Sequence, residues 1–528
     1  MADEASDMPD ELILADGLVR SLLDAGLTTM FGIGGTHTLQ LLGAIERASA
    51  MEFVPARTEL GAAYMAIGYA RATGRPAVVL TSTGPGSLNV VGVLEDAAWS
   101  STPLLHLTTS IGGDAFAGAV HETPHQQDIL GLASKALVLL DARDVTGSVA
   151  RAVAEAQRHP RGPVTLDVAA GKWGDTVSLR PVVSDHTEPQ TDPDLGPVLD
   201  VLDRAKRPLF FVGGGAMFAD HGRAVLALAE RLGAPIITSY QARTIADSRH
   251  PLYVGPWATE ASVQAMAAES DAAVVFGSKL SALGTGAWQL PLPEPTFWID
   301  LAGGPHGRYS HLFHIRADAA SVAMNLAARV EQRTAWADPA TLRREVLAAK
   351  RTSHPDEMAF LEVLAAAPGG GRWLAADMSK AGFWAMKFLE APEGELHAFS
   401  GYMAMGSALP MAIGMAVAVA EPVVAIVGDG AFQMSLAELA TLASLRLPVT
   451  VIVIVDHAYG ILRDNCAAVG GSASVGVDLW NPDLAMLATA FGIEVADVSD
   501  AEQLEAAMAV EAKAPRMILA RQRFTREW

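Results

Sequence analysis

The sequence has few of the residues on which several classes of protein depend. It contains one cysteine, Cys466, so no disulfide can form within the chain and no cysteine-based metal site can be built. Lys and Arg number 38 against 59 Asp and Glu, and the net charge of −21 argues against nucleic acid or an anionic membrane as the main partner. Only 18% of the residues are charged and 50% are hydrophobic, which is typical of a large, well-buried globular protein.

The sequence also lacks the apolar runs that mark membrane and exported proteins. Its first residues, MADEASDMPDEL, are acidic and polar, where a secretion signal would be basic and then apolar. In the last third of the chain the longest apolar run, residues 409–420, is too short to span a bilayer and ends at Glu421. We therefore expect no membrane partner and a cytoplasmic location.

An alternation of strand-like and helix-like segments is present and restarts three times along the chain. Runs of β-branched residues alternate with Ala- and Leu-rich stretches, as in parallel sheets flanked by helices. A chain of 528 residues is too long for one hydrophobic core, and the polar stretch 184–197 has the composition of a linker. We predict an α/β fold of three doubly wound parallel-sheet domains, at residues 1–180, 190–345 and 355–528.

The third block carries the most specific motif. A β-branched run at 423–427 predicts a buried strand that ends in Gly428, Asp429 and Gly430, and the next predicted strand ends at Asp456. Because neighbouring parallel strands end at the same edge of a sheet, the two carboxylates should lie together where such sheets bind ligands.

The residues between these two strands predict a helix. Ser435 and Glu438 have the spacing of a capping box, and Leu and Ala follow at helical spacing until Pro448. A helix N-terminus and glycines would let a diphosphate approach the backbone, and two carboxylates, a carbonyl and phosphate oxygens suit Mg²⁺. Taken alone, Gly-Asp-Gly would equally be a tight turn between a strand and a helix.

The spacing of Asp429 and Asp456, with its strand–helix–strand context, resembles the diphosphate–metal motif of thiamine-diphosphate enzymes. In that family the second metal ligand is usually Asn, and Asp456 keeps an oxygen ligand while adding a negative charge. The resemblance implies Mg²⁺ bound by Asp429, Asp456 and the carbonyl of Ala458. It also implies that the cofactor contacts Gly428, Gly430, Ala431, Tyr459 and Gly460.

Residues 401–410 resemble the family segment that precedes the metal strand. Met405 falls where a bulky apolar residue holds the cofactor in a V shape, and Met403 lies on the same segment. A core methionine is the ordinary alternative for each. Asp377 and Ser379 lie where related chains contact the diphosphate.

The first block offers Glu59 as a candidate base, at the start of a predicted helix after a short strand at 53–56. A first-turn Glu is common because the helix dipole stabilises it. The flanking residues 31–35 and 81–89 resemble the pyrimidine-binding domain of acetolactate synthase, benzaldehyde lyase and benzoylformate decarboxylase. The resemblance implies that Glu59 hydrogen-bonds the aminopyrimidine and that Thr83 is a cofactor contact. A buried carboxylate with a raised pKa suits that proton transfer.

Two histidines of the first block are candidates for proton transfer. His37 aligns with an active-site His of benzaldehyde lyase, and Thr36 beside it is a candidate substrate contact. His121 aligns with a Gln in a loop that faces the active site of acetolactate synthases. Histidine exchanges protons near neutral pH, so we predict both as catalytic, with a satisfied surface or core histidine as the alternative.

Residues 121–125, His-Glu-Thr-Pro-His, also match the zinc-peptidase pattern. That pattern needs a continuous helix to align its two histidines, and Pro124 interrupts one. A zinc peptidase is therefore the remote alternative.

The middle block gives little support for a bound nucleotide. Gly213, Gly214 and Gly215 follow a strand, but Phe218 replaces the last glycine of the dinucleotide motif. Residues 277–282 stand where acetolactate synthases carry a charged FAD-binding segment, and they do not match it. We therefore do not expect FAD.

Residues 463–466 are polar where benzoylformate decarboxylase has aromatic residues near its substrate, and Asn465 is a candidate substrate contact. A small or polar 2-oxo acid fits this position better than an aromatic one.

The resemblance covers essentially the whole chain and implies a thiamine-diphosphate- and Mg²⁺-dependent lyase or transferase. We predict a decarboxylase or carboligase of 2-oxo acids, similar to acetolactate synthase, that acts on a small-molecule carbonyl substrate. The alternative is a lyase or hydrolase that cleaves a C–C bond of a hydroxyketone or diketone without releasing CO₂. The family arrangement implies a homodimer or homotetramer, with active sites between the first domain of one subunit and the third of another.

Overall fold

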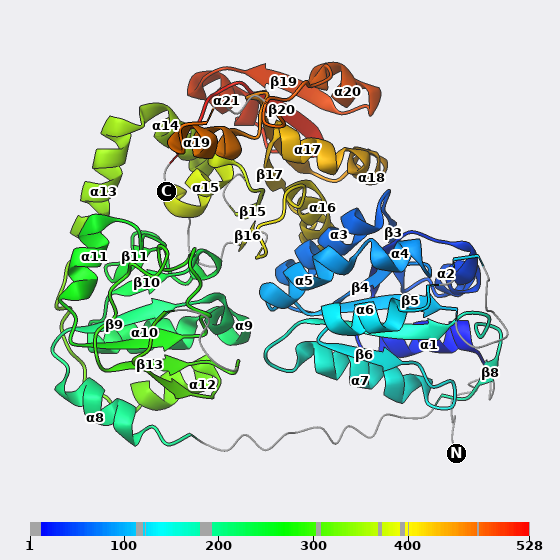
Figure 1. Cartoon of the computed structure of the whole chain (residues 1–528), viewed down its shortest axis with the longest axis horizontal. Coiled ribbons are helices and arrows are strands. Elements are labelled where there is room, and N and C mark those ends of the chain that lie inside the picture. The colour runs from blue at the N-terminus through cyan, green and yellow to red at the C-terminus, as the bar shows by residue number, and fades with distance from the viewer. Residues whose placement is uncertain are drawn as a thin grey trace, which may run out of the picture.

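The computed structural model describes residues 12–526 except 112–119, 122, 180–192, 303–307, 368–371, 391–395, 400 and 472–474. Three six-stranded sheets follow one another along this part of the chain, and all their neighbouring strands are parallel. Helices cover both faces of each sheet (Figure 1). The predicted fold class of three doubly wound parallel sheets is therefore confirmed. The boundary placed between residues 180 and 190 lies outside the described residues, and the domain limits stay a prediction.

The first sheet has the strand order β3-β2-β4-β5-β7-β6. Its strands are β2 Thr29–Gly32, β3 Glu52–Pro55, β4 Ala77–Leu80, β5 Leu104–Ser110, β6 Ala136–Leu139 and β7 Pro163–Ala169. Its helices are α1 Leu14–Asp24, η1 Thr36–Thr38, α2 Leu39–Arg47, α3 Glu59–Thr73, α4 Pro85–Leu88, α5 Val91–Trp99, α6 Gln126–Ala133 and α7 Val145–Gln157. A two-stranded antiparallel ribbon joins β1 Leu12–Ile13 to β8 Thr176–Val177.

The middle sheet has the order β11-β10-β9-β12-β13-β14. Its strands are β9 Pro208–Val212, β10 Ile236–Thr238, β11 Tyr253–Gly255, β12 Ala272–Phe276, β13 Thr296–Ile299 and β14 Leu312–Ile315. Around it lie α8 Gly196–Arg204, η3 Gly214–Ala216, α9 Met217–Asp220, α10 Arg223–Leu232, η4 Tyr240–Ala242, α11 Ala261–Ala268 and α12 Ala319–Ala327. Two helices, α13 Pro339–Ser353 and α14 Pro355–Ala366, lead to the third sheet.

The third sheet has the order β16-β15-β17-β18-β20-β19. Its strands are β15 Trp373–Ala376, β16 Leu396–Phe399, β17 Val423–Gly428, β18 Val449–Ile454, β19 Glu494–Val498 and β20 Arg516–Ala520. Its helices are α15 Lys380–Phe388, α16 Ala408–Val419, α17 Asp429–Met434, η5 Leu436–Glu438, α18 Leu439–Leu445, α19 Gly460–Ala468, α20 Leu484–Ala490 and α21 Ala501–Met508. The central strands β17 and β18 are buried on both faces, as their continuous Val and Ile runs require.

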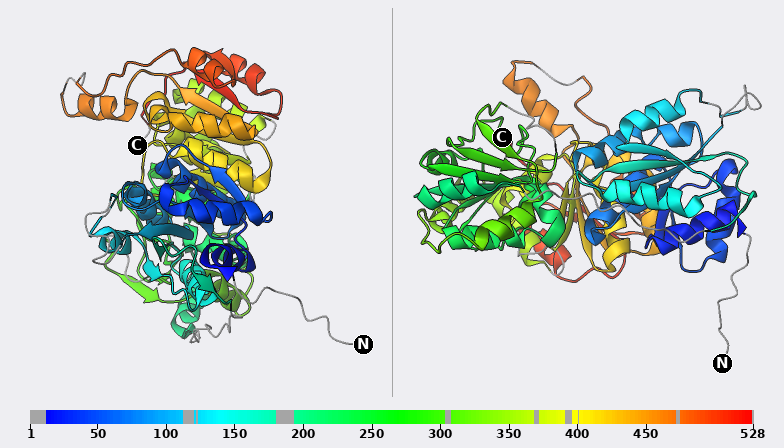
Figure 2. Two further views of the ribbon diagram at one scale, coloured as in Figure 1. Left: turned by 90° about the vertical axis from the view of Figure 1, so that its right-hand side faces the viewer. Right: turned by 90° about the horizontal axis from the view of Figure 1, so that it is seen from below.

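The first and third sheets are joined by a close helix crossing between α3 and α16. A Cβ placed on Gly68 would lie 2.1 Å from the carbonyl oxygen of Met411, and one on Gly414 would lie 1.8 Å from that of Met65. Only glycine permits this approach. In Figure 1 the first sheet (blue to cyan) lies at the lower right and the middle sheet (green) at the lower left, both beneath the third (yellow to red), and Figure 2 gives two further views. Among the described residues no helix is long and apolar enough to cross a membrane.

Candidate functional site

The two predicted metal ligands lie at the carboxyl ends of neighbouring strands. Strands β17 and β18 are parallel, with Gly428 paired to Ile454. Asp429 follows the first strand directly, and Asp456 follows the second after Val455. Burial and the charge of Asp429 raise the pKa of Asp456, so the two carboxylates repel each other across the strand ends. A bound cation would relieve that repulsion.

The Asp429 side chain is fully buried and held by three donors. Its Oδ1 accepts from the amide of Gly430 (2.9 Å), and its Oδ2 accepts from the amide of His457 (2.8 Å). Oδ2 also accepts from Asn481 Nδ2 (2.6 Å). Sequence reasoning missed Asn481, because it follows Asp429 by 52 residues and stands in no recognisable motif.

The chemistry of this set fits a divalent cation held with a diphosphate. Asp456 Oδ1 accepts from the amide of Ala458 (3.2 Å), and no hydrogen bond to Asp456 Oδ2 or to the carbonyl of Ala458 is found among the described residues. Two carboxylates and a carbonyl are the hard oxygen donors that Mg²⁺ takes. In the same part of the chain no group of three His, Cys, Asp or Glu side chains could hold a metal. Within the described residues, a third protein ligand would therefore have to be of another kind, such as this carbonyl.

The glycines predicted as cofactor contacts lie close to these ligands. A Cβ on Gly430 would meet the Tyr459 ring at 2.6 Å, and a Cβ on Gly460 would meet the Asp456 carboxylate at 2.4 Å. Ala431 lies next to Gly430 in α17 and is buried. The structure thus brings the predicted metal and diphosphate residues of the third block into one cluster.

Ser379 and Asp377 lie beside the cluster but have internal partners. Ser379 caps α15 by accepting from the amide of Gly382 (3.0 Å), and its Cβ would lie 3.4 Å from a Cβ on Gly428. The Asp377 carboxylate is fully buried and accepts from backbone amides within its own block. Burial raises the pKa of Asp377 to about 6, against the lowering effect of those amides.

The two methionines lie on a segment next to α17. Met403 and Met405 are each 39% exposed, which is unusual for core methionines and suits a surface that receives a ligand. Gly406 has a φ of +82°, and a Cβ there would lie 2.9 Å from the Cβ of Met434 at the end of α17.

Glu59 is the first residue of α3 and is half-buried within one chain, whereas its expected role favours a buried carboxylate. Its Oε2 accepts from Asn89 Nδ2 (3.1 Å), at the end of the loop that carries Thr83. The Thr83 hydroxyl donates to Gln126 Oε1 (3.1 Å), which also accepts from the amide of Gly84 (2.7 Å). Sequence reasoning missed Gln126, although it follows the histidine loop directly.

The two predicted catalytic histidines touch. The ring centroids of His37 and His121 lie 5.8 Å apart, and the two ring planes meet at 85° in an edge-to-face contact. Trp173 Nε1 donates to the carbonyl of His37 (2.6 Å), and the carbonyl of His121 lies 2.7 Å from a Cβ placed on Gly84. The contact places both side chains beside the loop that carries Thr83.

The geometry does not support a zinc peptidase. His121 has a φ of +70° and lies outside α6, which begins at Gln126. His125 is exposed and pairs with Asp128 (3.6 Å). Glu122 lies outside the described residues. The helix that this metal motif requires is therefore absent at His121 and at 123–125.

The predicted site residues form two separate sets in one chain. Among the described residues no hydrogen bond or ion pair joins Glu59 to Asp429 or Asp456. The candidate substrate contacts Thr36, in η1, and Asn465, in α19, are both exposed, and these elements lie well apart in every view (Figures 1 and 2).

One predicted interaction takes a different form. The capping box expected between Ser435 and Glu438 does not form, because Glu438 is fully buried and bonds to the first block. Its carboxylate accepts from the amides of Arg57 (3.2 Å) and Thr58 (2.9 Å) and from the Thr58 hydroxyl (2.8 Å). Thr58 is the N-cap of α3, so Glu438 fixes the start of the helix that carries Glu59.

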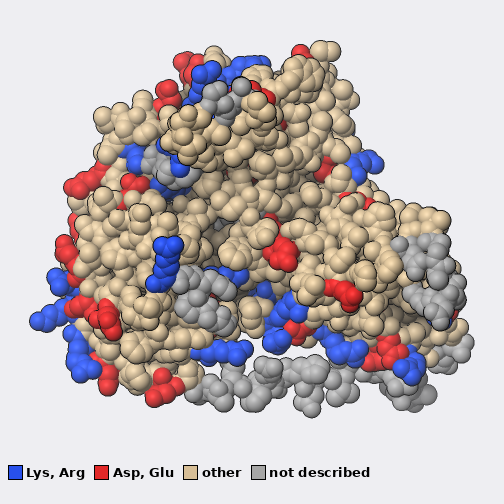
Figure 3. Space-filling model, viewed as in Figure 1, with Lys and Arg blue, Asp and Glu red and all other residues tan. Residues whose placement is uncertain are grey.

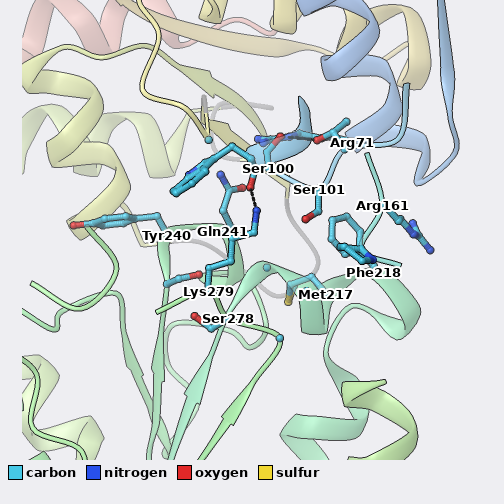
Figure 4. A pocket seen from close by; sticks show the side chains of 18 of the residues that line it. Arg71, Ser100, Ser101, Arg161, Met217, Phe218, Tyr240, Gln241, Ser278 and Lys279 are labelled. Atoms are coloured by element: carbon cyan, nitrogen blue, oxygen red, sulfur yellow. Dashed lines mark hydrogen bonds between the residues drawn. The ribbon is translucent and has the colours of Figure 1, made fainter. Parts of the chain in front are cut away.

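A cavity of about 630 Å³ opens where the three sheets face one another (Figure 4). It is lined by Arg71 and Trp99 from the first block, Lys279 from the middle block and Met403 from the third. Lys279 Nζ donates to the carbonyl of Trp99 (2.7 Å). On the face shown in Figure 3, Lys and Arg side chains gather where the first and middle blocks meet.

The glycines of the middle block are explained by packing. A Cβ on Gly213 would lie 2.4 Å from the carbonyl oxygen of Gly277, and one on Gly215 would lie 2.9 Å from the same atom. These turns therefore need glycine without any ligand. The expectation that FAD is absent stays a prediction.

Comparison with known proteins agrees with this architecture of parallel sheets with polar residues at their strand ends. A protein from Pseudomonas aeruginosa described as a probable 2-ketoarginine decarboxylase is 31% identical, over 94% of this chain and 91% of that one. An acetolactate synthase large subunit from Parasynechococcus marenigrum is 28% identical, over 97% and 88%. The solved thiamine diphosphate-dependent 4-hydroxybenzoylformate decarboxylase of Rhodococcus jostii RHA1 has the same fold, with a TM-score of 0.81 at 21% identity over 98% and 100% of the two chains.

Three family models match consecutive parts of the chain. They describe the N-terminal TPP binding domain of thiamine pyrophosphate enzymes at 13–130, their central domain at 195–328 and their C-terminal TPP binding domain at 377–519. The chain belongs to the thiamine pyrophosphate enzymes. This confirms the predicted family and its cofactor, thiamine diphosphate.

Proposed function

We propose that this enzyme is a Mg²⁺-dependent decarboxylase of 2-oxo acids with small or polar side chains. The observation that carries the proposal is the contact between His37 and His121 beside the Thr83 loop, because a decarboxylase needs a proton donor for the carbon that loses CO₂. The relatives described as decarboxylases support the same reaction class.

In this proposal Asp429, Asp456 and the carbonyl of Ala458 would hold Mg²⁺ together with the diphosphate of the cofactor. Asn481 orients Asp429 through its 2.6 Å hydrogen bond, as an outer partner of a metal ligand does. When bound, thiamine diphosphate supplies a nucleophilic carbon that adds to the substrate carbonyl and stabilises the charge left as CO₂ departs. Met405 would support the bound cofactor.

Glu59 holds the proton that activates the aminopyrimidine, and Asn89 fixes the direction of its carboxylate. Thr83 and Gly84 are held by Gln126, which gives this side of the site a defined shape. One of the two histidines then delivers a proton to the substrate carbon, in place of the departing carboxylate.

The candidate substrate segment on α19 is polar, and its two charged residues at 463 and 464 are both paired. Arg463 pairs with Asp478 (2.7 Å), and Asp464 pairs with Lys380 (2.8 Å). Asn465 follows these two residues on α19 and is exposed. An amide suits a hydrogen-bonding substrate tail better than a phenyl ring.

We propose further that two copies complete each active site. One chain leaves apolar side chains exposed on the blocks that carry the two half-sites: Leu39 and Leu60 in the first, and Met405, Met434 and Leu462 in the third. Apposing the first block of one copy with the third block of another would cover them and bury Glu59. A homodimer suffices for this arrangement, and a homotetramer would contain it twice.

The purified enzyme with thiamine diphosphate and Mg²⁺ should be offered 2-oxo acids with short, amide, guanidino and aromatic side chains. We expect CO₂ release from the small or polar ones, measured by mass spectrometry, and little from benzoylformate. Cleavage of hydroxyketones or diketones without CO₂ would favour the alternative lyase. Acetolactate from pyruvate as the main product would contradict the proposal.

A further inference from the structure

Residues 401–408, which carry Met403 and Met405 and are here named the methionine segment, are anchored at both ends by buried carboxylates. One anchor, Asp377, belongs to the same block. The other, Asp96, lies on α5 of the first block and is 1% exposed. We infer that Asp96, oriented by Tyr64, is a positioning residue that sets the methionine segment beneath the cofactor. The inference rests on the proposed role of Met405.

Asp96 binds the start of the segment directly. Its Oδ1 accepts from the amides of Gly401 (2.9 Å) and Tyr402 (3.2 Å). Two consecutive amides aimed at one carboxylate oxygen fix the direction in which the chain leaves Gly401. Hydrogen bonds to a charged acceptor are stronger than those to a neutral one, so this anchor resists displacement.

Tyr64 fixes the carboxylate itself. Its hydroxyl donates to Asp96 Oδ2 (3.3 Å), and the tyrosine is 2% exposed. Burial, followed by the charge of Asp96, raises the pKa of Tyr64 well above its ordinary value, so the hydroxyl stays a donor. Asp96 is thus held on one side and holds the segment on the other.

Asp377 fixes the far end of the segment. Its Oδ1 accepts from the amides of Met378 (2.8 Å) and Gly406 (3.1 Å), and its Oδ2 accepts from that of Ala408 (3.0 Å). Asp377 is therefore better explained as an anchor of this segment than as a diphosphate contact.

The backbone between the two anchors has an unfavourable conformation at Met403, which the anchors maintain. Met403 has a φ of +65°, in the left-handed region that residues with a side chain seldom adopt. Such a conformation persists where surrounding contacts over-determine it. Releasing the Asp96 anchor would let Met403 relax and would shift Met405.

The Asp96 anchor also ties the segment to the helix of the candidate base. Tyr64 lies on α3, which begins with Glu59, and Arg71 on the same helix donates to the carbonyl of Phe399 (2.8 Å). Helix α3 thus carries Glu59 at its start. Farther along, the same helix carries Tyr64 and Arg71, whose hydrogen bonds reach Asp96 and the strand that precedes the methionine segment.

The test compares Asp96→Ala, Asp96→Asn and Tyr64→Phe. The matched control is Asp271→Ala, because Asp271 also accepts from two consecutive amides, Lys206 (2.8 Å) and Arg207 (2.9 Å), but in the middle block. Hydrogen exchange of peptides from 401–408, measured without cofactor, should be faster in Asp96→Ala than in wild type and unchanged in Asp271→Ala. Asp96→Asn keeps an acceptor oxygen and should largely restore the wild-type pattern. Unchanged exchange in a folded Asp96→Ala would overturn the inference.

The second readout is deuterium exchange at the thiazolium C2 of bound thiamine diphosphate, at saturating cofactor and Mg²⁺. Misplacing the support should slow it about tenfold or more in Asp96→Ala, less in Tyr64→Phe and not at all in Asp271→Ala. If Asp96→Ala does not fold, Tyr64→Phe carries the test alone, and wild-type exchange in it would refute the inference.

A double-mutant cycle with Met405→Ala separates this inference from the function on which it rests. If Asp96 acts through Met405, adding Asp96→Ala to Met405→Ala should slow C2 exchange no further. Additive effects would show that Asp96 acts elsewhere. If Met405→Ala alone leaves C2 exchange unchanged, the proposed role of Met405 fails. If only Met405→Ala slows it, the Asp96 inference fails and the proposed function stands.

Discussion

At the scale of single residues, substituting a proposed metal ligand should weaken cofactor binding and leave the fold intact. Asp429→Ala removes a buried carboxylate at the strand end and should lower the affinity for thiamine diphosphate with Mg²⁺ by about 100-fold or more. Calorimetric titration measures this, with circular dichroism to check folding. Asp497→Ala, a surface carboxylate of the same sheet paired with Arg521, should bind the cofactor normally. Unchanged affinity in Asp429→Ala would remove it from the metal site.

Asn481 should matter less than Asp429 but in the same measurement. Asn481→Ala leaves both carboxylates in place and deletes the 2.6 Å bond that orients Asp429, so we expect a loss of about 10- to 100-fold in cofactor affinity. The effect should require Mg²⁺. A variant that binds as tightly as wild type would show that the two backbone amides hold Asp429 without help.

Glu59 should act on proton transfer and not on binding. Glu59→Gln keeps the shape and the contact with Asn89 but removes the charge, so C2 exchange should slow by about 10²- to 10⁴-fold at saturating cofactor. Exposed Glu46, on α2, gives a matched control in Glu46→Gln. Wild-type exchange in Glu59→Gln would reduce Glu59 to a residue that merely begins a helix.

Residues that the sequence predicted and those it missed differ in how their partners are encoded. Asp429 and Asp456 were predictable because strand period and register carry them to one edge. Asp96 and Glu438 bind backbone amides of distant segments. Every residue except proline has such an amide, so the residue type does not reveal the partner. Asn481 depends on a loop closing over Asp429, which local patterns do not specify.

At the scale of elements, strands were predicted best. The runs at 423–427 and 449–455 became β17 and β18 within one residue at each end, since buried parallel strands need continuous apolar runs. The helix expected from Ser435 is instead a short η5 followed by α18, after a helix α17 that the pattern did not show. The expected capping interaction does not form there, because Glu438 instead accepts a tertiary hydrogen bond from the residue that precedes α3.

The two histidine-bearing loops belong to this scale, because each histidine is placed by its loop. His121→Gln should lower the protonated product by about 10²-fold, the usual scale for losing a general acid, and leave cofactor affinity unchanged. His125→Gln is the control, since His125 is exposed on the same loop. Full activity in His121→Gln would leave His37 as the donor, and full activity in both single variants and the double variant would make the pair bystanders.

At the scale of the whole molecule, Glu59 and Asp429 belong to separate sets within one chain, and the arrangement of the three sheets explains this separation. Helices α3 and α16 cross so closely that the first and third blocks form one unit, with Glu59 and the proposed metal ligands in separate sets. Methionines and leucines stay exposed around both sets, which is why we propose that a second copy joins them. The family resemblance implies such an assembly, and it stays a prediction. Composition and periodicity could not suggest it, because they describe one chain and not the contacts between copies.

Subunit complementation tests the shared site directly. Glu59→Gln and Asp429→Ala each disable every site of a homodimer. A mixed dimer, co-expressed with two tags and purified through both, would have one site with both defects and one with neither, and so about half of the wild-type activity. A mixed dimer of Glu59→Gln with His121→Gln is the matched control: both changes lie in the first block, so each site keeps one defect and activity should not return. No recovery in the first pair, with stable dimers by light scattering, would place Glu59 and Asp429 in the same chain's site.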